Sequence, residues 1–131
     1  LYSVFKENFV TPTGGLQLVN YWPNPDQQDP TIINGKAEIF YKGEKLTIEA
    51  TDNGPISAYV SALKHHLDLP EFTLSNYEED AIGEGSTAEA VTFVDLTADD
   101  KIYTGIGRDS NINQSAIQAV TAAVNKILIA Q

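Results

Sequence analysis

Two glycines stand close together before a helical pattern near the end of the chain. They are Gly105 and Gly107, and apolar residues recur at helical spacing from Ile112 onward. Glycines before a helix let backbone amides approach an anion at the positive helix end, so the pattern resembles a phosphate cradle. No lysine follows and no βαβ unit precedes, so a plain tight turn is the favoured interpretation.

A second glycine turn precedes an earlier helical pattern. The segment Asp52-Asn-Gly-Pro55 leads into a stretch with Ile56 and Tyr59 on its apolar face. Proline suits the first helical turn, and Gly54 is free to take unusual dihedral angles. Two helix N-termini at equivalent places in two repeats can hold a carboxylate between them.

The remaining polar clusters favour no catalytic or metal site. His65 and His66 are consecutive, so on a helix they point about 100° apart and do not share a metal easily. The acidic run Glu78-Glu-Asp80 with Glu84 lacks the ligand spacing of a calcium hand, and a solvated acidic edge is favoured. No nucleophile, base and orienting acid form a set, which disfavours an independent enzyme.

Composition limits the class of protein. The chain has 131 residues, 42% of them apolar, which suits one domain rather than two. Its net charge of −10 opposes binding to nucleic acid and to anionic membranes. It has no cysteine, no apolar run long enough for a bilayer and no signal peptide, so we expect a cytoplasmic protein. Because it begins with Leu1, we expect a piece of a longer chain or a processed product.

The order of expected elements repeats. An amphipathic helix is expected over Leu1–Val10, and a strand over Leu16–Trp22 is ended by Pro23. Alternation then predicts a hairpin around Lys42-Gly43 that feeds the first helix. An offset of 56 residues carries Glu44 to Asp100 and Ile56 to Ile112. The second copy is expected as an extended stretch over 72–77, strands over 88–94 and 102–106 with a turn at 98–100, and a helix over 111–128 capped by Ser110 or Asn111.

These elements predict an α+β fold in which two pseudo-symmetric βββα units form a small two-layer domain. We expect a single domain over 1–131, with an N-terminal segment at 1–15, a first unit at 16–70 and a second unit at 71–131. The apolar face of the last helix is expected to comprise Ile112, Ala116, Ala119, Val120, Ala123 and Ile127.

The order of several short motifs resembles the C-terminal regulatory domain of 2-isopropylmalate synthase. The motifs are Asn53-Gly-Pro-Ile56, Leu74 with Tyr77-x-x-x-Ala81, Gly105-x-Gly-x-Asp-x-Asn-Ile112, and Ala119-Val followed by Ala123-Val-Asn125. Each motif alone is weak, but their order and spacing are specific. The related regulatory domain of citramalate synthase, which responds to isoleucine, shares the same plan.

This resemblance implies a homodimeric domain that binds a feedback inhibitor, L-leucine in the isopropylmalate enzymes. Matched to the motifs, the leucine site would comprise Gly54, Ile56, Ser57, Leu74, Tyr77, Ala81, Ala88, Ala90 and Ile112. The resemblance also implies a catalytic barrel in the same polypeptide, with its acyltransferase chemistry on acetyl-CoA and 2-oxoisovalerate and a divalent metal. No cofactor is expected in the regulatory domain itself. The alternatives are an isoleucine sensor of the citramalate branch and a dimerisation module without ligand.

Overall fold

In the part of the chain that the structure describes, two helices and six strands follow one another in the order strand, strand, strand, helix, twice over. The structure, a computed structural model, describes residues 15–83 and 88–130, so the helix expected over Leu1–Val10 lies outside the described residues. The elements are β1 (Leu16–Pro25), β2 (Ile33–Tyr41), β3 (Glu44–Asp52), α2 (Pro55–His66), β4 (Thr73–Ile82), β5 (Glu89–Ala98), β6 (Lys101–Asp109) and α3 (Ile112–Ala130).

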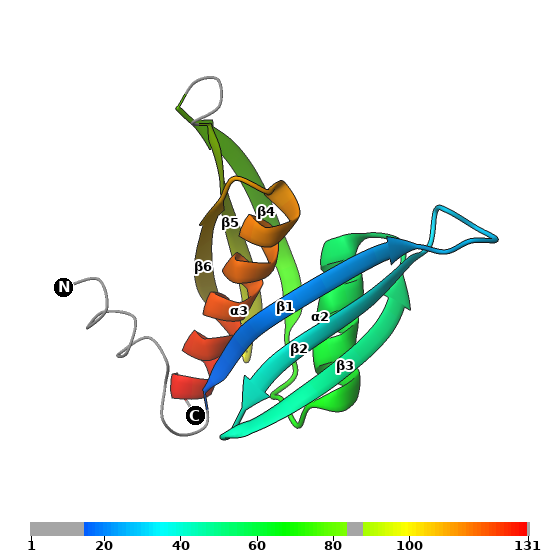
Figure 1. Cartoon of the computed structure of the whole chain (residues 1–131). Coiled ribbons are helices and arrows are strands. Elements are labelled where there is room, and N and C mark those ends of the chain that lie inside the picture. Colours follow the sequence, from blue (N-terminus) through cyan, green and yellow to red (C-terminus); the bar gives the residue numbers. More distant parts are fainter. Residues whose placement is uncertain (1–14, 84–87, 131) are drawn as a thin grey trace.

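Each unit is an antiparallel three-stranded sheet followed by one helix (Figure 1). Sheet A has the order β1-β2-β3 and sheet B the order β4-β5-β6, and the two sheets share no strand. The predicted α+β fold of two βββα units is therefore confirmed. Neither helix in the described part of the chain is long and apolar enough to cross a membrane.

In part of each unit, the spacing between equivalent residues differs by one from the predicted offset. β3 and α2 begin 57 residues before β6 and α3. The bulges in β1 and β4, at Val19 and Ser75, are 56 residues apart. The predicted offset of 56 is therefore right for the first strand of each unit and one residue short for the rest. Glu44 is equivalent to Lys101, not to Asp100.

The two inner hairpins use the same turn. Lys42 and Gly43 join β2 to β3, and Asp99 and Asp100 join β5 to β6, all with positive φ. Two-residue loops with two positive φ values match the right-handed twist of the flanking strands, and aspartate tolerates this region better than most residues. Both hairpin turns were predicted, and both are confirmed.

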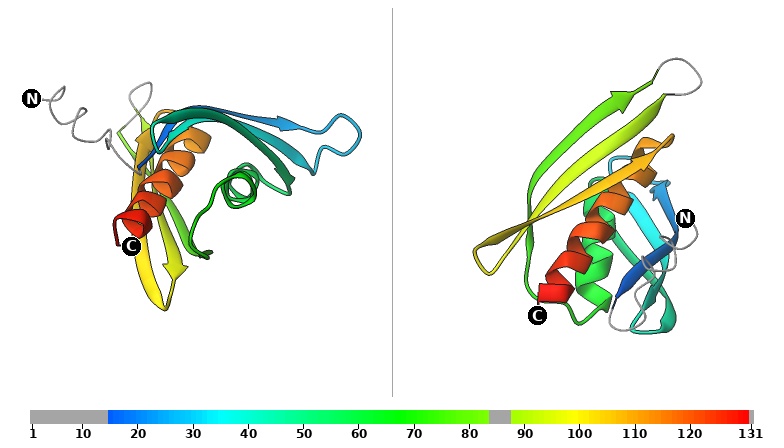
Figure 2. Two further views of the ribbon diagram at one scale, coloured as in Figure 1. Left: turned by 90° about the horizontal axis from the view of Figure 1, so that it is seen from below. Right: turned by 90° about the vertical axis from the view of Figure 1, so that its left-hand side faces the viewer.

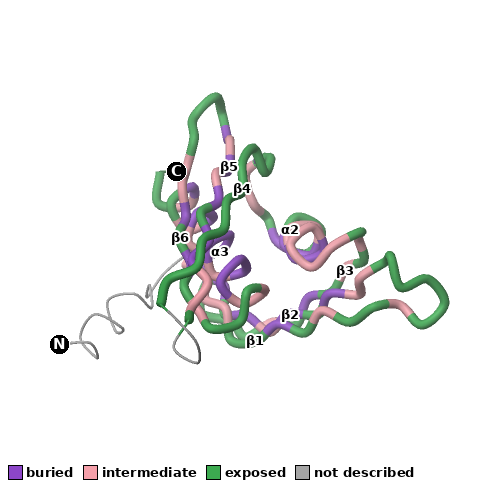
Figure 3. The backbone as a smooth tube through the Cα atoms, turned by 90° about the horizontal axis from the view of Figure 1, so that it is seen from above, coloured by how far each residue is buried: buried purple, intermediate pink, exposed green. Residues whose placement is uncertain are grey.

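The core lies between the sheets and the helices (Figures 2 and 3). α2 packs on β2 and β3, whereas α3 packs on β5 and β6 and also on β1 of the other sheet. The Tyr59 hydroxyl joins the two helices by a buried 2.7 Å hydrogen bond to Thr121 Oγ1. The Asn125 side chain joins α3 to β1, because it accepts from Leu16 N and donates to Leu16 O, each over 2.7 Å. The fully buried side chains Phe72, Ile39, Ile48, Leu63, Leu96 and Ile117 fill the space between.

Strand β1 continues past the point where its prolines were expected to end it. Pro23 pairs with Gly35 and Pro25 with Ile33 in the antiparallel register. Because β1 is an edge strand, a proline whose missing N–H faces solvent removes no ladder hydrogen bond. The predicted end at Trp22 is therefore wrong by three residues.

The predicted glycine turn of the second unit is also wrong. Gly105 and Gly107 lie inside β6 and are buried. A Cβ atom at Gly105 would collide with the carbonyl oxygen of Ala119, and one at Gly107 with that of Ser115. These glycines therefore let the backbone of α3 lie directly on the strand. The turn before α3 lies at residues 110–111 instead.

The last helix begins one residue after its cap, as expected. Asn111 Oδ1 accepts a 3.1 Å hydrogen bond from Gln114 N, which is the pattern of an N-cap. The predicted apolar face is buried at Ala116, Ala119, Val120, Ala123 and Ile127. Its first member departs from that face, because Ile112 is 48% exposed.

Candidate functional site

An open pocket lies where the ends of β4 and β5 meet the start of α3. Its volume is about 410 Å³. The side chains that line it come from three segments: Glu79, Asp80 and Ala81 on β4; Ala88, Glu89 and Ala90 at the start of β5; and Ser110 and Ile112 at the start of α3. The small alanines make the hollow, since neighbouring large side chains would fill it.

Four of the nine predicted site residues line this pocket, namely Ala81, Ala88, Ala90 and Ile112. Ala81 and Ala90 are direct cross-strand partners, which places both methyl groups on one face of sheet B. The other five, Gly54, Ile56, Ser57, Leu74 and Tyr77, do not line it. The predicted set is therefore divided between this pocket and two neighbouring surfaces.

The first of these surfaces is the helix-facing side of β4. Leu74, Tyr77 and Ala81 pair with Leu96, Val94 and Ala90, a row that alternates along β5 and turns toward α3. Every residue of β4 is exposed, including Leu74 at 38% and Tyr77 at 36% (Figure 3). These side chains form an uncovered stripe that leads into the pocket at Ala81.

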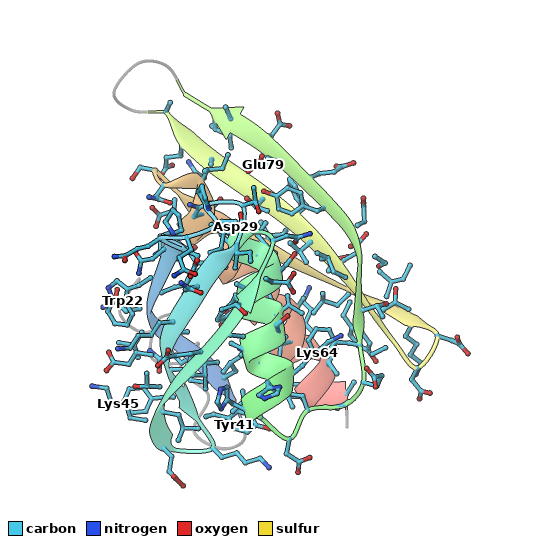
Figure 4. All side chains as sticks on the ribbon, turned by 90° about the vertical axis from the view of Figure 1, so that its right-hand side faces the viewer. Trp22, Asp29, Tyr41, Lys45, Lys64 and Glu79 are labelled. Carbon is cyan, nitrogen blue, oxygen red and sulfur yellow. The ribbon has the colours of Figure 1, made fainter. Side chains whose placement is uncertain are left out.

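Glu79 alternates with Tyr77 and Ala81, so the three residues share one side of β4. Figure 4 labels Glu79 on this strand. Partial burial raises the pKa of Tyr77, and a hydrogen bond to the Glu79 carboxylate raises it further. Tyr77 therefore stays a neutral donor that holds the Glu79 carboxylate at the mouth of the pocket. Sequence reasoning treated Glu79 only as part of a solvated acidic edge. Its alternation with Tyr77 and Ala81 was the signal that it shares their face.

The start of α3, on the other side of the pocket, favours negative charge on a ligand rather than positive charge. The first amides of a helix, here those of Ile112 and Asn113, have no partner within the helix and carry a partial positive charge. Asn111 already occupies the amide of Gln114, and Asp109 Oδ1 accepts from the amide of Asn111 over 2.9 Å. One side of the pocket is thus acidic, and its helix-start side favours an anion. Glu89 forms a 2.7 Å ion pair with Arg108 Nε at the pocket rim.

The second surface is the start of α2. Gly54 is the residue before the helix and has φ −167° and ψ 163°, an extended conformation open to any residue. The unusual dihedral angles expected there are therefore not found. Ile56 and Ser57 are half-buried in the first turn. The Tyr21 hydroxyl donates to Pro55 O over 2.6 Å, so this helix start is tied to sheet A rather than to the pocket.

The predicted surface histidines are exposed at the end of α2. His66 Nε2 lies 3.0 Å from Glu49 O, and its ring meets the ring of His65 edge to face at 5.5 Å. The acidic run at 78–80 lies on the exposed edge strand β4, not in a loop. Over residues 15–83 and 88–130, no three histidine, cysteine, aspartate or glutamate side chains gather as a metal site would require.

Comparison with known proteins places the chain in a family. The family model described as the LeuA allosteric (dimerisation) domain matches residues 1–128. A 2-isopropylmalate synthase of Rhizobium johnstonii is 33% identical over 98% of this chain, one of Brucella suis 30% over 98%, and one of Clostridium acetobutylicum 28% over 96%. The chain spans 23% of the length of each of these relatives. The chain thus belongs to the LeuA allosteric (dimerisation) domain family.

Proposed function

We propose that the chain is the allosteric domain of a 2-isopropylmalate synthase and that it binds L-leucine as a feedback inhibitor. The observation that carries the proposal is the pocket between Ala81, Ala90 and Ile112, which offers three kinds of surface in one hollow. Its apolar wall suits a branched side chain. The amides at the start of α3 suit a carboxylate, and the Glu79 carboxylate suits an ammonium group.

The volume of the pocket also supports a small ligand. A hollow of about 410 Å³ lies at the low end of the range for small-molecule sites. It has room for one amino acid. A ligand that carries a positive and a negative charge side by side fits a pocket that has an acidic wall on one side and the start of a helix on the other.

The choice among branched amino acids rests on the family. The relatives named above are 2-isopropylmalate synthases, which favours leucine over isoleucine. An isoleucine sensor of the citramalate branch is the second candidate, and a dimerisation module without ligand is the third. The catalytic barrel, its divalent metal and its acyl transfer from acetyl-CoA belong to the proposal for the whole polypeptide, as does a cytoplasmic location.

Calorimetry with the 131-residue chain separates these candidates. We expect leucine to bind more tightly than isoleucine and valine at millimolar concentration or below. A response to isoleucine alone would move the chain to the citramalate branch. Heat from none of the three would leave the dimerisation module.

A substitution that fills the hollow tests its position. Ala90→Phe is expected to weaken leucine binding at least tenfold, because the ring takes the volume that the ligand side chain needs. Thr47→Phe adds a ring to the exposed outer side of sheet A and serves as the matched control. Unchanged leucine affinity in Ala90→Phe would place the ligand elsewhere, and the next candidate surface would be the stripe of Leu74 and Tyr77.

A further inference from the structure

The sequence contains two Asn-Gly pairs, which the fold places in opposite surroundings. They are Asn34-Gly35 and Asn53-Gly54. Asparagine is a chemically labile residue, because the backbone nitrogen of the next residue can attack its carboxamide. Glycine in the next position favours this attack, since it has no Cβ atom to obstruct the approach. The structure around each pair therefore decides which asparagine can react.

The first pair is held inside sheet A. Gly35 is buried in β2, the central strand, where the neighbouring strands take up the backbone N–H groups on both sides. The phenol of Tyr21 fills the space where a Gly35 Cβ atom would stand. The Asn34 carboxamide donates from Nδ2 to Asp26 Oδ1 over 3.3 Å. Ring closure needs the Asn34 backbone to rotate out of the extended conformation, which the ladder on both sides prevents.

The second pair lies in the short segment between β3 and α2 (Figure 1). Asn53 is exposed, and a Cβ atom built on Gly54 would meet no heavy atom within 4 Å. In the part of the chain that the structure describes, no hydrogen bond uses the N–H of Gly54 or the carboxamide of Asn53. The attacking nitrogen and the carboxamide are thus both free, and neither residue belongs to a strand or a helix.

We propose that Asn53 is a site of spontaneous deamidation, whereas Asn34 is protected by the fold. After the N–H of Gly54 loses its proton to water or hydroxide, the nitrogen attacks Cγ of Asn53. The new N–Cγ bond closes a cyclic imide, the Cγ–Nδ2 bond breaks, and ammonia leaves with a proton from the solvent.

One water molecule then opens the imide ring. Attack at Cγ gives aspartate, whereas attack at the backbone carbonyl carbon of residue 53 gives isoaspartate, whose main chain runs through Cγ. Water is the only other reactant. The reaction needs no ligand, so it is independent of the proposed leucine site.

Both ends of the reacting segment are anchored, so the isoaspartyl product changes the entry to α2. On the strand side, Asp52 pairs in register with Ile33 and accepts a 2.8 Å hydrogen bond from Ser61 Oγ. On the helix side, Pro55 O accepts the 2.6 Å hydrogen bond of the Tyr21 hydroxyl. An isoaspartyl link adds one methylene group to the main chain between these anchors. We expect this extra length to disturb one of them and to lower the melting temperature.

Mass spectrometry of the aged chain tests the proposal. The folded 131-residue chain is incubated in water enriched in heavy oxygen, so that each asparagine converted during the incubation carries the label. Peptides that span the two pairs are then quantified. We expect Asn53 to convert at least about tenfold faster than Asn34, which corresponds to a difference of about 1.4 kcal/mol in the barrier. Equal rates in the folded chain would overturn the proposal.

Unfolding supplies the matched control within the same molecule. In concentrated guanidinium chloride both pairs lose their surroundings, and their rates should agree to within about threefold. A slow Asn34 in the unfolded chain would show that local sequence rather than sheet A protects it. The rate at Asn53 should also rise from neutral to mildly alkaline pH, because the backbone nitrogen must lose its proton. A rate that stays constant over this range would contradict the imide.

Two variants separate the reaction from its consequence. Gly54→Ala should slow the conversion of Asn53 at least about tenfold, because the methyl group obstructs the nitrogen while the fold has room for it. Unchanged conversion would rule out attack by this nitrogen. Asn53→Asp carries the new charge without the extra methylene group. The isoaspartyl form of the unmodified chain should therefore melt at a lower temperature than Asn53→Asp, and equal melting temperatures would contradict the proposed effect on α2.

Discussion

Tyr21 and Tyr77 occupy equivalent positions on the first strand of each unit, yet only Tyr21 is buried. Tyr21 is 3% exposed and lies over Gly35, where a Cβ atom would collide with the phenol. The equivalent of Gly35 in sheet B is Thr92, whose hydroxyl is buried and bonded to Ser115 Oγ over 2.6 Å. Thr92 thus takes the space over which the Tyr77 ring would lie. The missing side chain at Gly35 lets Tyr21 on β1 be covered, whereas the side chain of Thr92 leaves Tyr77 on β4 exposed beside the pocket.

The two tyrosines should therefore respond differently to truncation. Tyr21→Ala removes a buried ring with an edge contact to Tyr59 at 5.3 Å, and we expect a loss of about 3 kcal/mol or more of unfolding free energy. Tyr77→Ala should cost less than about 1 kcal/mol, because its ring is partly in solvent. Urea denaturation followed by circular dichroism measures both. Equal losses would show that Tyr77 is packed as tightly as Tyr21.

The glycines of β6 predict a large effect from the smallest possible side chain. Gly105→Ala puts a methyl group into the backbone of α3 at Ala119, and separating the helix from the strand should cost about 3 kcal/mol. Gly54→Ala is the matched control, because a Cβ there meets no heavy atom within 4 Å and its φ suits alanine. The control should lose less than about 1 kcal/mol by the same thermal or urea measurement.

The Asn125 side chain is expected to hold β1 on α3. In Asn125→Ala, the buried residue Leu16 loses the partners of both its N–H and its C=O, which should cost about 2 kcal/mol. The exposed neighbour Lys126→Ala should change stability by less than about 0.5 kcal/mol. Hydrogen exchange adds a local readout, since the amides of β1 should lose protection before those of β3. Unchanged protection of β1 would argue against this role.

Stability should fall at alkaline pH through the buried tyrosines. Burial raises the pKa of Tyr21 to about 12 and raises that of Tyr59 as well. The unfolded chain therefore releases these protons first, near pH 10, and stability present below pH 10 declines as the pH rises toward 12. Denaturation midpoints between pH 9 and 12 measure the slope. Tyr21→Phe should reduce it by up to one proton, whereas a slope that is independent of Tyr21 would contradict the linkage.

Local patterns predicted most of the elements because their causes are local. Alternation with turn residues predicted the hairpin at Lys42-Gly43. Polar residues before a helical period predicted a cap at Ser110 or Asn111, and Asn111 is the one found. Pro23 misled for a different reason, since a proline ends a central strand but not an edge strand, and the edge position of β1 depends on the sheet order. The glycines of β6 misled in the same way. The sequence does not distinguish a glycine in a turn from a glycine that lies under a helix, because the difference depends on where the helix packs.

The predicted site residues coincide only in part with the lining of the pocket, for a related reason. Ala81, Ala90 and Ile112 gather because sheet register and helix position bring together positions far apart in the chain. Motif order identified them without that geometry. Gly54, Ile56 and Ser57 came from the same motif order, but the start of α2 is tied to Tyr21 rather than to the pocket.

Because the backbone of α3 lies directly on β6, this helix is held rigidly, with one end at the pocket and the other at sheet A. Ile112 begins it beside the pocket, and Asn125 holds β1 about 20 Å further along, at 1.5 Å per residue. With no side chains at Gly105 and Gly107 to yield, a tilt at the first turn is carried to the far end rather than absorbed. In the proposed function, α3 and Asn125 are thus the route by which a ligand at the pocket would move the edge of sheet A.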